Sequence, residues 1–186
     1  MSIPNDTLSI PVSTDVILSV RESICETFGT MFGNEIESHD LNEDAHNEGE
    51  AIIGIISYVG DFKWSMLLCL PKSTAVTMAM KFAGFEIDYD GPDMGDIVAE
   101  LANIIAGDVV ARLSNRGINA ALSLPMVVRG AGLKLQWQRE LPTHYQSFIS
   151  ADGEFKTKIV AGTPHHWFGG MSGVSKVSGS ELNKAC

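Results

Sequence analysis

Hydrophobic positions along the chain recur with two different periods, one helical and one extended. Over residues 15–32 apolar side chains return every three or four positions, which predicts a core-facing helix that ends at Gly33. Residues 51–59 are apolar and rich in β-branched side chains, Gly60-Asp61 is a turn signal, and residues 63–70 are mostly apolar again. These two runs predict an antiparallel hairpin.

Two further helices are expected after the hairpin. Pro71 suits the first turn of a helix that Gly84 ends. A polar loop then leads into a longer helix over about 96–114, with an acid, Asp93 or Asp96, in the first turn, where it suits the helix dipole.

The remaining segments predict a second set of strands. Residues 118–123 have an extended pattern, and 125–130 predicts a short strand with Pro125 at its end, because proline has no amide hydrogen to donate. Polar and apolar residues alternate in three later segments, which are 133–138, 144–149 and 154–160. The order of these elements predicts an α+β fold. Two pseudo-symmetric halves each contribute a long helix and strands to one antiparallel sheet, which packs against the long helices.

The long helix carries one narrow polar stripe. At about 100° per residue, the polar residues and one glycine of this segment fall within a sector of roughly 60°. They are Asp96, Glu100, Asn103 and Gly107. The rest of the circumference is largely apolar, so the helix is expected to bury most of itself. A glycine on an exposed helix face costs up to about 1 kcal/mol relative to alanine, and close approach of another molecule is one reason for it.

Size and charge limit the kinds of partner. The chain has 186 residues, of which 45% are hydrophobic, and this is enough for one well-buried core. We expect a lead-in over 1–14, one domain over 15–161 and a flexible tail over 162–186. The 13 Lys and Arg residues against 23 Asp and Glu residues give a formal charge of -10. A nucleic acid or an anionic membrane surface is therefore a disfavoured partner.

The cysteines and the chain start favour a cytoplasmic protein. Cys25, Cys69 and Cys186 have no C-x-x-C spacing, and we interpret them as reduced thiols. The first residues lack the basic and apolar regions of a signal peptide, and no apolar run reaches about 18 residues.

Metal binding is the minor interpretation at two places. Residues 35–50 are rich in acids and contain His39 and His46, but such a run is more often a solvated loop. His165 and His166 are adjacent, and adjacent imidazoles rarely bind one ion.

The stripe itself does not resemble a complete active site. Two carboxylates on one helix face do not span a substrate as a glycosidase pair does. The chain shows neither a nucleophile beside a histidine nor a phosphate-binding G-x-x-x-x-G-K loop. Asn103, however, offers both a donor and an acceptor that can hold a water, and Glu100 offers a charge for a cation. The stripe is suited to completing the site of a partner, and the simpler interpretation is a solvated helix face.

The residues around the stripe resemble a known family. Asp96-x-x-x-Glu100-x-x-Asn103, followed after 21 intervening residues by Pro125, is similar to the signature of the CheC/CheX/FliY phosphatases of bacterial chemotaxis. Three segments resemble the CheX branch in particular: GDIVAELANIIAG, LPMVVRG and GDFKWSMLLCLPKSTA. The similarity covers roughly residues 15–161.

This resemblance implies a fold with two pseudo-symmetric halves, a homodimer, and removal of the phosphoryl group from the aspartyl phosphate of a CheY-type response regulator. Asn103 would orient the hydrolytic water and Glu100 would pair with the invariant lysine of the receiver, while Asp96 and Gly107 lie on the surface that a partner covers. The chain would need no cofactor of its own, because the Mg²⁺ of the reaction belongs to the response regulator.

Members of the CheC type carry the motif on both long helices. In this chain the first helix has Glu22-x-x-Cys25 with Leu18 before it, so we expect one catalytic helix, as in CheX. Two alternatives stay open. One is a non-enzymatic module that binds a receiver or a flagellar-switch component, and the other is a structural domain without chemistry.

Overall fold

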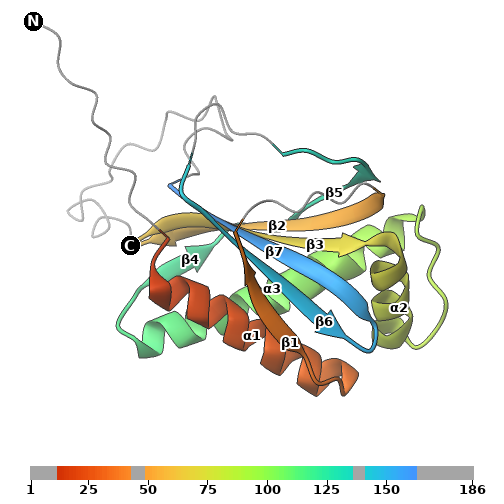
Figure 1. Cartoon of the computed structure of the whole chain (residues 1–186), viewed down its shortest axis with the longest axis horizontal. Helices are drawn as coiled ribbons and strands as arrows, with labels where there is room; N and C mark the ends of the chain where they lie inside the picture. Colours follow the sequence, from red (N-terminus) through yellow and green to blue (C-terminus); the bar gives the residue numbers. More distant parts are fainter. Residues whose placement is uncertain (1–11, 43–48, 136–140, 163–186) are drawn as a thin grey trace, which may run out of the picture.

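A single antiparallel sheet organises the fold, and the computed structural model describes it over residues 12–42, 49–135 and 141–162. Helices α1 (Thr14–Phe32) and α3 (Pro92–Asn115) lie against one face of the sheet, and α2 (Lys72–Ala83) lies at one end (Figure 1). The seven strands are β1 (Glu37–Leu41), β2 (Glu50–Gly60), β3 (Lys63–Pro71), β4 (Ala120–Leu122), β5 (Met126–Ala131), β6 (Thr143–Ser150) and β7 (Gly153–Ala161). The predicted α+β fold is confirmed.

The strand order contains a pseudo-two-fold relation. Along the sheet the order is β1-β6-β7-β3-β2-β4, and β5 continues the pairing of β4 on β2. One half consists of α1, β1 and the β2-β3 hairpin, and the other of α3, β5 and the β6-β7 hairpin. If each strand is replaced by its counterpart in the other half, the strand order along the sheet reads in reverse. Because β1 pairs with β6 and β5 pairs with β2, each half completes the sheet of the other.

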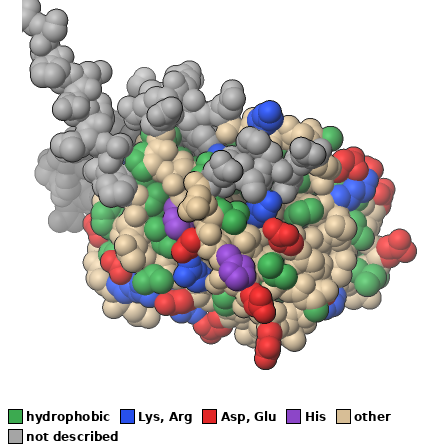
Figure 2. All heavy atoms as spheres, viewed as in Figure 1, with side chains coloured by type: hydrophobic (Ala, Val, Ile, Leu, Met, Phe, Trp, Pro, Cys, Tyr) green, Lys and Arg blue, Asp and Glu red, His purple; other side chains and the backbone are tan. Residues whose placement is uncertain are grey.

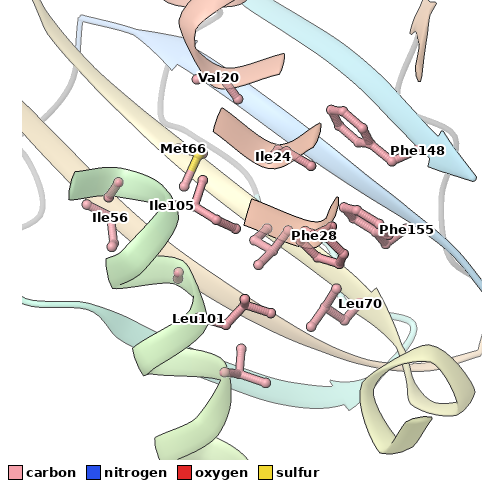
Figure 3. Packing of buried hydrophobic residues seen from close by; sticks show 14 of the residues in the cluster. Val20, Ile24, Phe28, Ile56, Met66, Leu70, Leu101, Ile105, Phe148 and Phe155 are labelled. Carbon is pink, nitrogen blue, oxygen red and sulfur yellow. The ribbon is translucent and has the colours of Figure 1, made fainter. Parts of the chain in front are cut away.

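Helix α1 packs through large side chains. Val20, Ile24 and Phe28 are fully buried. The ring of Phe28 stacks on that of Phe155, with 4.6 Å between the centroids, and Figure 3 shows Phe148 beside them. Burial of each such side chain contributes roughly 1.5–3 kcal/mol, so this cluster anchors α1 on the half of the sheet formed by β6 and β7.

Where helix α3 meets strand β2 at Gly54, it packs through small side chains. A Cβ atom built on Gly54 of β2 would lie 3.0 Å from the Cβ atom of Ala102 and 3.3 Å from Cγ1 of Val98. Backbone and helix therefore approach closely at this point. Leu101 and Ile105 fill the space on one side of the contact, among the buried residues of β2 and β3 (Figure 3).

The other face of the sheet has a smaller apolar cluster. Its buried members are Ile53, Ile55, Leu67 and Val160, and Leu133, Leu135 and Leu141 cover them. The prediction of a strand over 133–138 is wrong for 133–135, which have no regular structure, and 136–138 lie outside the described residues. The alternation of Leu133 and Leu135 has a different cause, because both side chains pack onto this second face.

Two further boundaries differ from the sequence expectation. Residues 37–41 form the edge strand β1 within the segment expected to be a loop. This strand pairs with β6, and the register runs from Glu37 opposite Ile149 to Leu41 opposite Tyr145. An edge strand exposed to solvent can be polar, so its composition resembled that of a loop. Helix α3 begins at Pro92, one turn earlier than expected, because proline at the first position suits a helix start.

The expected lead-in and tail lie mostly outside the described residues, so the division into 1–14, 15–161 and 162–186 stays a prediction.

The contact at Gly54 generates a prediction for stability. Gly54→Val would place methyl groups against Val98 and Ala102, and overpacking of this kind costs roughly 1–3 kcal/mol. We expect the free energy of unfolding in urea to fall by that amount. In the double variant with Ala102→Gly, removal of the Ala102 Cβ atom makes room for the valine, and part of the lost free energy of unfolding should be recovered. An unchanged urea midpoint in Gly54→Val would show that the close contact is absent.

Candidate functional site

The polar stripe of α3 faces solvent as expected. Asp96, Glu100, Asn103 and Gly107 are all exposed, whereas Val98, Leu101, Ala102 and Ile105 on the remaining circumference are buried. Since α3 begins at Pro92, Asp93 is the acid of the first turn and Asp96 lies beyond it. Asp96 is therefore not the acid of the first turn, and its side chain belongs to the exposed stripe.

Glu100 and Asn103 have no side-chain partner among the described residues. Other polar residues of α3 are engaged: Arg112 Nε donates to Asp108 Oδ2 at 2.7 Å. An exposed carboxylate and an exposed carboxamide one turn apart keep their full hydrogen-bonding capacity for another molecule. The structure places the two side chains on one exposed face of α3.

Ion pairs between the two long helices hold the second half of α3. Arg112 contacts Glu22 at 3.1 Å and also Glu26, and Arg116 contacts Glu22 at 3.0 Å. The hydrogen bond that Arg112 donates to Asp108 raises the pKa of Arg112 against the opposing effect of burial, and the charge of Asp108 raises it further. Figure 2 shows acidic and basic side chains side by side near α1 on the face in view.

On α1, the residues at the positions that correspond to Glu100 and Asn103 are Glu22 and Cys25, and both interact within the chain. Glu22 accepts hydrogen bonds from both Arg112 and Arg116. Cys25 is half-buried, and burial raises the pKa of its thiol. A carboxylate paired in this way and a thiol in place of a carboxamide do not reproduce the arrangement on α3, so the described residues bring together one such pair.

Pro125 stands just before β5, at a strand end as expected. The amide of Ser123 donates to the carbonyl of Ser57 at 2.9 Å, and the amide of Ser57 donates to Ser123 Oγ at 3.0 Å. Leu124 and Pro125 therefore form the short link between β4 and β5, and Leu124 is 90% exposed. Both strands contact α3.

One residue near the start of α3 was missed by sequence reasoning. Arg129 of β5 donates to the backbone carbonyls of Tyr89, Asp90 and Gly91. Nothing in the local sequence of a short strand marks such a contact, because its partners lie about forty residues earlier in the chain.

The metal-site alternatives receive no support from the described part of the chain. No group of His, Cys, Asp and Glu residues there could hold a metal ion, and His39 is exposed with Nε2 3.9 Å from Glu37. His46, His165 and His166 lie outside the described residues. No helix among the described residues is long and apolar enough to cross a membrane.

Solved structures place the fold in a known class. A CheC-like superfamily protein from Shewanella sp. PV-4 is similar to this chain with a TM-score of 0.71 and 20% identity, covering 82% of this chain and 100% of its own. The chemotaxis protein CheX from Vibrio vulnificus has a TM-score of 0.71 and 20% identity, covering 80% and 100%. The CheX-CheY-BeF3-Mg²⁺ complex from Borrelia burgdorferi has a TM-score of 0.62 and 22% identity, covering 80% and 98%. The fold is that of the CheC-like proteins.

The sequence comparison assigns the family within that class. The family model for chemotaxis phosphatase CheX matches residues 52–149, which include the whole stripe and Pro125. This chain therefore belongs to the CheX family of chemotaxis phosphatases. A search of curated proteins finds no match.

The exposed position of Gly107 generates a prediction for the free protein. A Cβ atom added at Gly107 would meet nothing within 4 Å. Gly107→Ala should therefore raise the free energy of unfolding by up to about 1 kcal/mol through helix propensity alone. Urea unfolding measures this change. A loss of stability would mean that the fold itself requires the glycine.

Proposed function

We propose that this chain is a phosphatase that hydrolyses the aspartyl phosphate of a CheY-type response regulator. The observation that carries the proposal is the pair of exposed side chains without partners among the described residues, Glu100 and Asn103, on one face of α3. Membership of the CheX family supports a chemotaxis phosphatase. The CheX-CheY complex from Borrelia burgdorferi, a structure with this fold, supports a CheY-like partner.

In the proposed reaction, Asn103 enters the receiver and holds the attacking water. Its carbonyl oxygen accepts a hydrogen bond from the water and its amide donates one, so the water is oriented in line with the bond from phosphorus to the aspartyl oxygen. The water oxygen bonds to phosphorus as that bond breaks. The products are the free aspartate carboxylate and inorganic phosphate, which retains the protons of the water.

Glu100 supplies binding and alignment in this proposal. Its carboxylate pairs with the invariant lysine of the receiver, one helical turn from Asn103, and so fixes the angle at which α3 enters the site. The receiver holds the Mg²⁺, which stabilises the charge on the phosphoryl oxygens. We further propose that the chain acts as a homodimer in the cytoplasm, as the family resemblance and the scattered cysteines indicate.

Asp96 and Gly107 extend the proposed contact along α3. Both are exposed on the same side as the catalytic pair. A glycine at 107 allows the backbone of the receiver to approach the helix without a side chain between them. Asp96 stands one turn before Glu100 and adds a second carboxylate for a cationic group of the receiver.

Removal of the carboxamide tests the proposal. With a cognate phosphorylated receiver, Asn103→Ala should reduce the rate constant for phosphate loss at saturating phosphatase by on the order of 10², because the water loses its positioned partner. The measurement is release of labelled phosphate from the receiver. Asn115→Ala, the same change at an exposed position at the end of α3, is the matched control and should retain the full rate.

Glu100→Ala should act differently and chiefly raise KM, by roughly tenfold or more, because an interfacial charge pair is lost. Glu37→Ala, on the edge strand β1, is its control. Equal rates for the wild type and Asn103→Ala would contradict the proposed mechanism. Receiver binding by the wild type without any acceleration of phosphate loss would select the non-enzymatic binding module.

A further inference from the structure

Arg129 holds the backbone at the start of α3. Its Nη2 atom donates to the carbonyl of Asp90 at 2.9 Å, and Nη1 donates to that of Gly91 at 3.1 Å and also to that of Tyr89. Gly91 is the N-cap residue of α3. One planar guanidinium thus fixes three successive carbonyls at the entrance to the helix that carries Glu100 and Asn103.

The strand that carries Arg129 is tied to the strand that supports α3. Residues of β5 pair with β2 so that Arg129 lies opposite Ile52 and Val127 lies opposite Gly54. Gly54 is the point where α3 touches the sheet. The Arg129 contact and the Gly54 contact are therefore two residues apart on one pair of strands, and the spacing between them is set by the β2-β5 register.

The two contacts restrain different movements of the helix. The contact of Gly54 with Val98 and Ala102 fixes the distance between helix and sheet at one point. The ion pairs of Arg112 and Arg116 act through flexible side chains at the other end. Arg129 acts on main-chain atoms directly, so it restrains the axial position and the rotation of α3.

The surroundings of the contact are aromatic and basic. The ring of Tyr89 is buried, and Lys72 Nζ lies 4.7 Å from its centroid while the guanidinium carbon of Arg129 lies 5.5 Å away. Burial raises the pKa of Tyr89, and the charge of Glu50 raises it further against the opposing effects of Arg129 and Lys72. Lys72 contacts the same ring as Arg129, but its ion-pair partner is Glu50, at 2.6 Å.

We propose that Arg129 is a positioning residue for the reaction of Glu100 and Asn103, acting through the first turn of α3 and making no contact with the reacting groups. The inference rests on the proposed phosphatase function. Because reactions that depend on orientation lose about 10²-fold for a displacement of about 1 Å, loosening this end of the helix lowers the chemical rate more than it lowers binding.

Arg129→Lys and Arg129→Met test the proposal with Lys72→Met as the matched control. Lysine keeps the charge but presents a compact ammonium in place of the planar fork. In the receiver assay we expect both Arg129 variants to lower kcat at least tenfold with KM within about twofold of wild type, and Lys72→Met to keep kcat. Intact kcat in both Arg129 variants overturns the proposal. So does an increase in KM alone, which would indicate direct contact with the receiver.

Amide hydrogen exchange in the free protein provides a readout that does not need activity. Arg129→Lys should exchange faster over residues 95–103 than wild type, with α1 unchanged. Uniformly faster exchange along the chain would indicate a general loss of stability and would overturn the positioning role. If the wild type does not accelerate phosphate loss, the proposed function fails, whereas the exchange measurement still decides whether Arg129 restrains α3.

Discussion

The contact between α3 and β2 at Gly54 is the constraint on which the site depends. With no side chain at Gly54, the helix lies close to the strand, and Val98 and Ala102 occupy the contact. These two residues lie on roughly the opposite side of the helix from Glu100 and Asn103. Burial of one face therefore exposes the other, and the outward position of the polar pair follows from packing that lies beneath it.

The pseudo-symmetric halves use their long helices for different purposes. Helix α1 packs with large rings on β7 and places Glu22 in ion pairs with Arg112 and Arg116. Helix α3 meets β2 through small residues at Gly54 and leaves Glu100 and Asn103 without side-chain partners among the described residues. The same arrangement of helix and strands thus occurs twice with different roles. Helix α1 is structural and forms ion pairs with α3, whereas the exposed face of α3 is available to a partner.

The sequence predicted the exposed position of the polar stripe well because helical periodicity is a local property. Once Val98, Leu101 and Ile105 define the buried side of α3, the direction of Asn103 is determined. Features set by distant contacts were not predictable in this way. The polar strand β1 looked like a loop because its pairing partner β6 lies a hundred residues later, Leu133 and Leu135 alternate for packing on the second face, and Arg129 finds its carbonyls across the β5-α3 contact. The family motif suggested the proposed chemistry, which periodicity alone left open.

The central claim is that the Asn103 carboxamide enters the site of a phosphorylated receiver. The most direct measurement is the side-chain amide resonance of Asn103 in ¹⁵N-labelled protein, titrated with a receiver carrying beryllium fluoride as a phosphoryl mimic. The account predicts a large shift of this resonance at the stoichiometry of the complex, with Asn115 unaffected. An Asn103 resonance that stays unchanged while the complex forms would contradict it.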